Sequence, residues 1–359
     1  MDLNKHQGFS QLDQSGMLAH IDQLPGQLEQ AWSLGLSQPL PKWQGINHVV
    51  IAGVGGSAIG ADLLAEYASL NSRVPVVIHR AYGLPDWARG DNTLVIASSH
   101  SGNTEETLSA FEQALENGCR LLAVTRGGLL AEKAQNNAVP VWLFQHEGQP
   151  RAAVAFSFGL LIAALARLHL LPDIAAIGEE LTSAVEAMRL QQPSLAAETP
   201  LSRNPAKRLA GQCVDRWITI FGSAPLTAVA RRWKCQVNEV AKAWAQFEFI
   251  PEADHNTLAG IYHPQNELCH AMMLFLQAPS YHPRDILRTD LTRKALMIEG
   301  INTDAIEARG DTPLAHIWTS LHFGDYFAYY LAMAYDVDPT PITAIEAFKR
   351  EMETPLSGS

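Results

Sequence analysis

The first half of the chain repeats one local pattern: a short apolar run stops at a turn, and a helical pattern follows. Residues 48–68, HVVIAGVGGSAIGADLLAEYA, show an apolar run at 49–52, a glycine-rich turn and helical spacing over 61–67. Residues 92–118 and 120–138 repeat the same order. Strands separated by helices of this length form right-handed βαβ units. The pattern therefore predicts a doubly wound parallel sheet covered by helices on both faces.

Further segments extend this α/β pattern along the chain. VPVVIHRAY (74–82) and VPVWLF (139–144) indicate two more strands, and FSFGLLIAALARLHLL (156–171) indicates an apolar helix. After residue 204 the pattern returns, because residues 216–248 again give strand, glycine turn and helix, and ELCHAMMLFLQA (267–278) indicates a later strand. The turns GVGGSAIG and FGSAPL make the two halves weakly similar. We therefore predict two α/β domains.

The prolines and the change of pattern give the predicted boundaries. Residues 1–40 form a helical lead-in, 41–190 a first domain, 205–335 a second domain and 336–359 a C-terminal helix. Between the domains the pattern is first helical and then polar, with prolines at 193, 200 and 205. We expect the linker between the domains to lie there.

Composition excludes several classes of protein. The 359 residues carry a net charge of −11, which disfavours nucleic-acid binding because a phosphate backbone requires a basic face. No apolar run approaches the ~20 residues that span a membrane, and MDLNKHQGFSQLDQSGM lacks the features of a secretory signal, so we expect a cytoplasmic protein that binds no membrane. The cysteines form no CxxC pair, and we expect buried free thiols at Cys119, Cys213, Cys235 and Cys269.

Two turns rich in glycine and hydroxyl groups follow predicted strands. Open α/β sheets bind ligands beyond the carboxyl ends of their strands, where helix N-termini and small polar groups suit a phosphate. A helix cap is the simpler interpretation of any one hydroxyl. A dinucleotide site is disfavoured, because the glycines depart from GxGxxG spacing and no acidic residue ends the next strand. We expect phosphate to bind at Gly55, Gly56, Ser57, Ser99, Ser101 and Thr104.

Several motifs occur together in an order that resembles a known family. GVGGSAIGADLL and SHSGNTEETL resemble the sugar isomerase (SIS) domain, a flavodoxin-like unit that binds phosphosugars. QPRAAVAFSFG, NEVAKA, EADHN and VDPTPITAIEAFKREM follow as in bifunctional phosphoglucose/phosphomannose isomerases, over residues 17–352. The resemblance implies two SIS domains. It also implies interconversion of glucose 6-phosphate and mannose 6-phosphate with fructose 6-phosphate by enediolate proton transfer, without metal or cofactor.

The resemblance also implies roles for individual residues. Glu239 corresponds to the catalytic base, and Arg151 to the arginine beside the enediolate. His255 and Lys349 correspond to groups that assist ring opening, and His255 reaches the site from the second subunit of a homodimer. A threonine that leaves room for the mannose epimer corresponds to Thr340 or Thr343.

Some alternatives remain open. Glu239 has to be free of a local cation to act as the base, and Lys242, three residues away, is a candidate surface partner. His100 stands where relatives carry tyrosine, and we expect it to line the phosphate loop and add a pH-dependent charge. A regulatory SIS protein that binds a phosphosugar without turnover needs the hydroxyl loops but not the four predicted catalytic residues. Their joint presence favours the enzyme.

Overall fold

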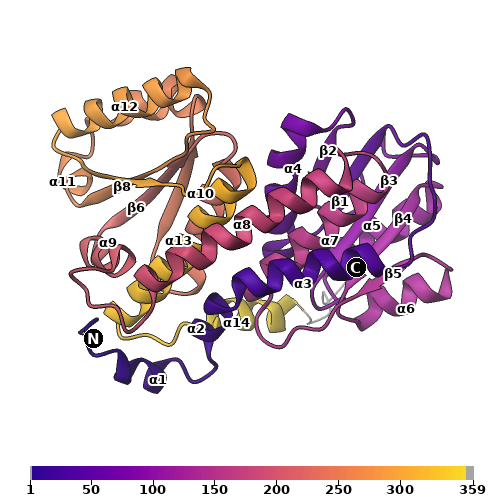
Figure 1. The fold of residues 1–359 in the computed structure, drawn as a ribbon, viewed down its shortest axis with the longest axis horizontal. Helices are drawn as coiled ribbons and strands as arrows, with labels where there is room; N and C mark the ends of the chain where they lie inside the picture. Colours follow the sequence, from indigo (N-terminus) through magenta and orange to yellow (C-terminus); the bar gives the residue numbers. More distant parts are fainter. Residues whose placement is uncertain (1, 353–359) are drawn as a thin grey trace.

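The computed structural model of the chain describes residues 2–352 and contains two parallel sheets covered by helices (Figure 1). The first sheet has the order β2-β1-β3-β4-β5, in which β1 lies between β2 and β3. This is the flavodoxin-like, doubly wound order, with its switch point between β1 and β3. The predicted fold class is confirmed. The strands are β1 (His48–Ala52), β2 (Val76–His79), β3 (Thr93–Ser99), β4 (Arg120–Thr125) and β5 (Val141–Leu143).

The second sheet repeats the arrangement of the first four strands. Its order is β7-β6-β8-β9, and every neighbouring pair is parallel. The weak similarity of the two glycine turns therefore corresponds to two related sheets, with β1 and β6 in matching positions. The strands are β6 (Trp217–Gly222), β7 (Ala245–Phe249), β8 (Ala271–Gln277) and β9 (Asn302–Glu307).

Helix α4 begins six residues earlier than the sequence pattern indicates. It runs over Gly55–Asn71, whereas we expected helical structure to begin at Ala61 after a glycine turn. Gly56 and Gly60 are packing residues of the helix itself. A Cβ added to Gly60 would lie 2.5 Å from the Cβ of Ser157, so only glycine allows α4 to pack this closely against α7 (Val154–Arg167).

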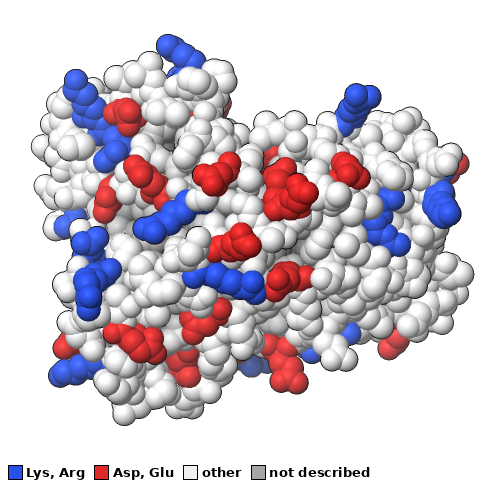
Figure 2. All heavy atoms as spheres, viewed as in Figure 1, with Lys and Arg blue, Asp and Glu red and all other residues white. Residues whose placement is uncertain are grey.

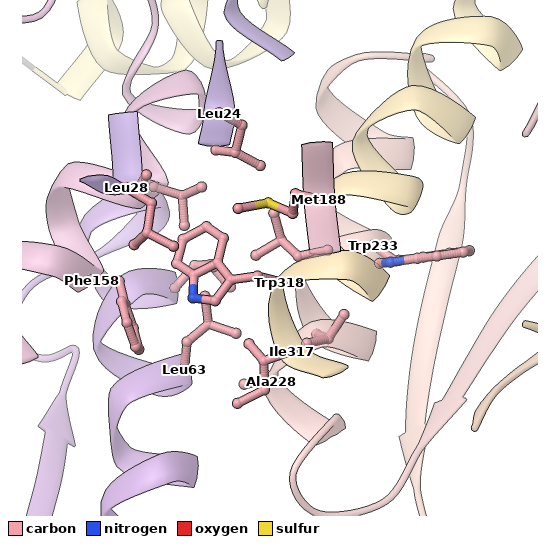
Figure 3. Close-up of a cluster of buried hydrophobic side chains, with 14 of the residues drawn as sticks. Leu24, Leu28, Leu63, Phe158, Met188, Ala228, Trp233, Ile317 and Trp318 are labelled. Carbon is pink, nitrogen blue, oxygen red and sulfur yellow. The ribbon is translucent and has the colours of Figure 1, made fainter. Parts of the chain in front are cut away.

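One hydrophobic core joins the two halves of the molecule. Figure 3 shows Trp318 of α13 (Pro313–Ala334) surrounded by side chains of helices from both halves, among them Leu28, Leu63, Phe158 and Met188. Helix α8 (Ile174–Leu195) and α13 contact each other along the middle of the molecule (Figure 1). The domain boundaries stay a prediction, because the core runs through both halves.

The remaining helices cover the sheets or extend to the termini. The predicted C-terminal segment 336–359 contains a helix, α14, over Thr343–Met352, and residues 353–359 lie outside the described part of the chain. The others are η1 (His6–Gly8), α1 (Phe9–Leu12), α2 (Met17–Asp22), α3 (Leu24–Ser37), α5 (Glu105–Glu116), α6 (Gly128–Asn136), η2 (Pro150–Ala153), α9 (Pro205–Cys213), α10 (Thr227–Glu239), η3 (Glu252–His255), η4 (Thr257–Gly260), α11 (Gln265–Leu268) and α12 (Pro283–Ile298).

Three compositional expectations can be compared with the structure. The cysteines are free, but only Cys213 is fully buried: Cys119 and Cys235 are partly buried, and Cys269 is exposed because it follows the short surface helix α11. The expectation of burial is therefore wrong for Cys269 and met only in part for Cys119 and Cys235. Among the described residues, one helical stretch, Pro150–Arg167, is long and apolar enough to span a membrane, and 89% of it is buried inside the fold. On the face drawn in Figure 2, basic side chains are interspersed with acidic ones.

Candidate active site

The two predicted phosphate-binding turns lie side by side at one edge of the first sheet. β1 and β3 are adjacent and parallel, with Ala52 opposite Ala97, so the segments that follow them emerge together at the switch point. Ser57 lies in the first turn of α4, and its Oγ accepts a hydrogen bond of 3.1 Å from the backbone N–H of His100. The structure therefore brings the two turns into direct contact.

The four hydroxyl groups of these turns are arranged to donate. Ser57 and Ser101 accept bonds from the backbone N–H groups of His100 and Asn103, and within residues 2–352 their own hydrogens have no acceptor. The Oγ of Ser99 and the Oγ1 of Thr104 lie 2.9 Å apart, so one of their two hydroxyl hydrogens is used in the hydrogen bond between them. Three hydroxyl hydrogens therefore remain for an anion, beside the N-terminus of α4.

Ser57, Ser99, Ser101 and Thr104 form what we call the hydroxyl cradle. Gly102 and Gly56 fix its shape. Gly102 has φ +73° and an added Cβ would lie 1.8 Å from the carbonyl oxygen of Gly127, so the loop requires glycine. An added Cβ at Gly56 would lie 2.8 Å from the carbonyl oxygen of Pro150 and 3.2 Å from the backbone nitrogen of Arg151. The cradle and Arg151 thus share a wall.

Arg151 is buried, and one of its guanidinium nitrogens is clamped while the other two have no hydrogen bond to the described residues. Its side chain is 3% exposed, and Nη2 donates to the backbone carbonyl oxygens of Pro339, at 3.0 Å, and Thr340. Nε and Nη1 have no hydrogen-bond partner in the described part of the chain. Burial lowers the pKa of Arg151, while the Glu239 carboxylate acts in the opposite direction. Because an arginine pKa starts far above neutrality, the group keeps its charge at neutral pH.

Glu239 faces Nη1 of Arg151. Its Oε2 lies 3.7 Å from Nη1 of Arg151, and 27% of its side chain is exposed. Glu239 therefore does have a local cation in the resting protein, so the condition set for a base is not met there. The cation is Arg151 and not Lys242, because α10 ends at Glu239 and Lys242 turns back to donate to the carbonyl oxygens of Glu239, at 2.7 Å, and Val240, at 3.3 Å.

Lys242 belongs to the same group of charges. It takes the left-handed backbone conformation, with φ +57°, and its ammonium caps the C-terminal end of α10. Burial and the nearby Arg151 lower the pKa of Lys242 to about 8. The sequence offered Lys242 only as a surface partner of Glu239, and its place beside Arg151 was missed.

The two candidate threonines have different surroundings. Thr340 touches Arg151 through its carbonyl oxygen, and its buried Oγ1 has no hydrogen-bond partner in the described chain. Thr343 is exposed at the start of α14. Lys349 is exposed on the same helix and makes no hydrogen bond or ion pair with residues 2–352.

His255 does not join this group within one chain. Helix α10 runs from the carboxyl end of β6 back to the amino end of β7, so Glu239 lies at the amino edge of the second sheet. His255 is exposed and follows the carboxyl end of β7, a five-residue strand that spans ~16 Å. Asp254 is held by Arg288, at 3.1 Å, and Thr292, at 2.7 Å, and is not free to orient the histidine.

His100 is a neutral part of the wall beside the phosphate loop. It is 6% exposed, and its Nε2 lies 3.1 Å from Nδ1 of His146. Burial, with smaller effects from His146 and Arg126, lowers the pKa of His100 to about 4. The expected pH-dependent charge is therefore absent near neutral pH.

Comparisons with known proteins agree with this geometry. Residues 202–352 match the bacterial phospho-glucose isomerase C-terminal SIS domain. A bifunctional phosphoglucose/phosphomannose isomerase of Caldicellulosiruptor bescii is 34% identical over 340 residues, which cover 94% of this chain and 98% of that protein. A second, of Thermoplasma acidophilum, is 35% identical over 312 residues, which cover 85% and 90% of the two chains.

The fold has solved counterparts as well. A putative phosphosugar isomerase of Clostridium difficile matches with a TM-score of 0.71 at 14% sequence identity, over 95% of this chain and 99% of the other. At that identity the match supports the fold alone. The two relatives, in contrast, are more than 30% identical over nearly their full length. The chain therefore belongs to the bifunctional phosphoglucose/phosphomannose isomerase family.

Proposed function

We propose that this protein interconverts glucose 6-phosphate, mannose 6-phosphate or both with fructose 6-phosphate by proton transfer through an enediolate, with no metal or cofactor. The observation that carries the proposal is the pair Arg151–Glu239, 3.7 Å apart, which shares a wall with the hydroxyl cradle through Gly56. An anion seat, a carboxylate and a guanidinium are the groups that this reaction of a phosphosugar needs.

The hydroxyl cradle is the proposed seat of the substrate phosphate. Ser57, Ser99, Ser101 and Thr104 offer hydrogen-bond donors that carry no net charge, beside the α4 N-terminus. Because the chain as a whole carries −11, a local arrangement of donors has to attract the anion. Gly55 and Gly56 let the backbone approach it closely.

Glu239 is the proposed base. Its carboxylate removes the proton from C2 of the open-chain aldose, a proton passes from O2 to O1 of the enediolate, and the carboxylate returns its proton to C1, which yields the ketose. Negative charge grows on the O1 and O2 atoms as the enediolate forms. Nη1 of Arg151, which lies on the side of Glu239 and has no hydrogen-bond partner in the described chain, can donate to this charge, and one such donor contributes roughly 3 kcal/mol to the transition state.

Thr340 is the proposed neighbour of C2 that separates the two epimers. Its partnerless Oγ1 lies beside the Arg151 clamp, whereas Thr343 is exposed. Lys349 is the proposed proton relay for ring opening, carried by α14, whose start lies close to the Thr340 carbonyl that binds Arg151.

A homodimer completes the proposed site. His255 is exposed and lies at the edge of the second sheet opposite Glu239, so it can assist ring opening only at the site of a second copy. Exposed apolar side chains on α14, Ile345, Phe348 and Met352, offer surface for such an association. The regulatory interpretation is not favoured, since a phosphosugar sensor has no use for the Arg151–Glu239 pair.

A coupled assay of chelator-treated protein tests the proposal. Glucose 6-phosphate and mannose 6-phosphate are supplied separately, and fructose 6-phosphate is measured for wild type, Glu239→Gln and the matched control Glu299→Gln, an exposed glutamate after α12. We expect turnover by wild type and the control, and a loss of at least a thousandfold in Glu239→Gln. Phosphosugar binding without turnover by wild type would support the sensor instead.

A further inference from the structure

Helix α13 carries a buried carboxylate in the middle of the molecule. Asp325 accepts hydrogen bonds from Nε and Nη2 of Arg232, at 3.2 and 2.8 Å, and from Nε2 of Gln236, at 2.9 Å. All three residues are at most 3% exposed. A buried ion pair is costly to desolvate, and apolar residues of similar volume often stabilise a core at least as much as the ion pair does. The group therefore calls for a reason beyond packing.

The buried pair reaches the proposed catalytic arginine through one bond. Nη2 of Arg232 also donates to the backbone carbonyl oxygen of Arg151, at 2.8 Å. Arg151 stands in η2 of the first half and Arg232 in α10 of the second, so this bond joins the two halves at the site. With Nη2 of Arg151 clamped by Pro339 and Thr340, the residue is held at both its backbone and its guanidinium.

The same carboxylate also fixes the helix that carries the proposed base. Arg232, Gln236 and Glu239 are spaced by four and three residues, which places them on one face of α10. Asp325 binds the first two of them, and Glu239 follows one turn later. Rotation of α10 about its axis is thereby restricted next to the carboxylate of Glu239.

We infer that Asp325, Arg232 and Gln236 are positioning residues that set the distance and orientation between Arg151 and Glu239. The inference rests on the proposed function, in which these two groups act on the enediolate. The hydroxyl cradle is built by the first half, and within residues 2–352 its hydroxyl groups make no hydrogen bond to the three residues. Loosening them should therefore lower kcat much more than it raises KM, since misplacing a reacting group by about 1 Å costs up to roughly a hundredfold in rate.

The chain offers a matched pair of variants for the test. Gln236→Met removes a buried amide that donates to α13, and Gln191→Met does the same on α8, where Nε2 of Gln191 donates to the carbonyl oxygen of Thr319 at 2.9 Å. Both glutamines are at most 3% exposed. We expect Gln236→Met to lower kcat at least tenfold with KM within about twofold, and Gln191→Met to leave both near wild type.

Arg232→Lys is the second variant, because it keeps the charge but loses the planar fork that binds both Asp325 and the Arg151 carbonyl. It should likewise lower kcat and leave KM nearly unchanged, with circular dichroism confirming that each variant is folded. Wild-type kcat in folded Gln236→Met and Arg232→Lys, while Glu239→Gln is inactive, would overturn the inference and leave the proposed function intact. An equal loss of kcat in Gln191→Met would also overturn the inference, because the effect would then follow from removing any buried amide of this core. An inactive wild type would instead remove the proposed function.

Discussion

At the residue scale, the proposed chemistry depends on the division of Arg151 into a clamped Nη2 and an unpartnered Nη1. The clamped Nη2 holds the guanidinium against two backbone carbonyls, and Nη1 faces Glu239. Glu239 thus keeps a charged partner in the resting protein. In the proposed reaction, a substrate oxygen accepts a hydrogen bond from Nη1 of Arg151 while the Glu239 carboxylate approaches the C–H bond. The Arg151–Glu239 ion pair is therefore compatible with the role of Glu239 as base.

His100 leads to a prediction about acid stability. Burial lowers its pKa from 6.5 to about 4, so between these pH values the unfolded chain takes up a proton that the folded chain does not. The contribution of neutral His100 to the free energy of unfolding is therefore complete above pH 6.5 and is lost as the pH falls toward 4. His100→Gln should remove roughly 3 kcal/mol of the drop in unfolding free energy between pH 7 and pH 4.

Urea unfolding at the two pH values measures this difference. His270→Gln, at an exposed position, is the matched control and should keep the wild-type drop. An identical drop in wild type and His100→Gln would show that the histidine titrates normally in the folded protein.

At the scale of elements, the sequence predicts the strands more reliably than it predicts the start of helix α4. The apolar runs give β1 and β6 within one residue and end β3 two residues early, because buried parallel strands are almost continuously apolar and β3 continues into two serines. The start of α4 was misplaced because glycine usually ends a helical pattern. Here Gly56 and Gly60 are demanded by the close approach of η2 and α7, which no local pattern reveals.

Gly56→Ala should disturb the site through this contact. The new methyl group would lie 2.8 Å from the Pro150 carbonyl, so the segment that carries Arg151 has to move. We expect a loss of at least tenfold in kcat/KM and of about 1–3 kcal/mol in unfolding free energy, measured by the coupled assay and by urea titration.

Gly26→Ala is the control, because Gly26 lies within α3 and, apart from its chain neighbours and the backbone of its own helix, no atom is within 4 Å of the added methyl group. That change should keep activity and add up to about 1 kcal/mol of stability. Equal activity in the two variants would contradict the role given to the contact between α4 and η2.

At the scale of the whole molecule, the predicted site residues separate into those that one chain brings together and those that it does not. The hydroxyl loops, Arg151, Glu239 and Thr340 meet in one region, although the sequence separates them by up to 285 positions. Motifs could nominate these residues, but only long-range packing shows their contacts. Asp325 escaped notice because it lies in α13, a helix buried along most of its length, and no motif marks it.

The proposed dimer leads to a complementation experiment. Glu239→Gln and His255→Asn are each expected to be nearly inactive. If each site combines Glu239 of one copy with His255 of the other, a mixed dimer has one intact site and one doubly altered site. An equal mixture that exchanges subunits should recover about one quarter of wild-type activity, because half of the dimers are mixed.

Activity of the mixture is compared with that of each variant alone at the same total concentration. A mixture of two Glu239→Gln preparations serves as the control and should recover nothing. No recovery after demonstrated subunit exchange would place His255 and Glu239 at separate sites.

The central claim is that Glu239 moves a proton between C1 and C2, and isomerisation in D2O tests it most directly. Glucose 6-phosphate is converted by wild type in D2O and the product is examined by NMR. The account predicts deuterium at C1 of fructose 6-phosphate, because a carboxylate that holds the proton can exchange it with solvent, and no exchange or product with Glu239→Gln. Product that carries no deuterium, formed equally well by Glu239→Gln, would contradict the account.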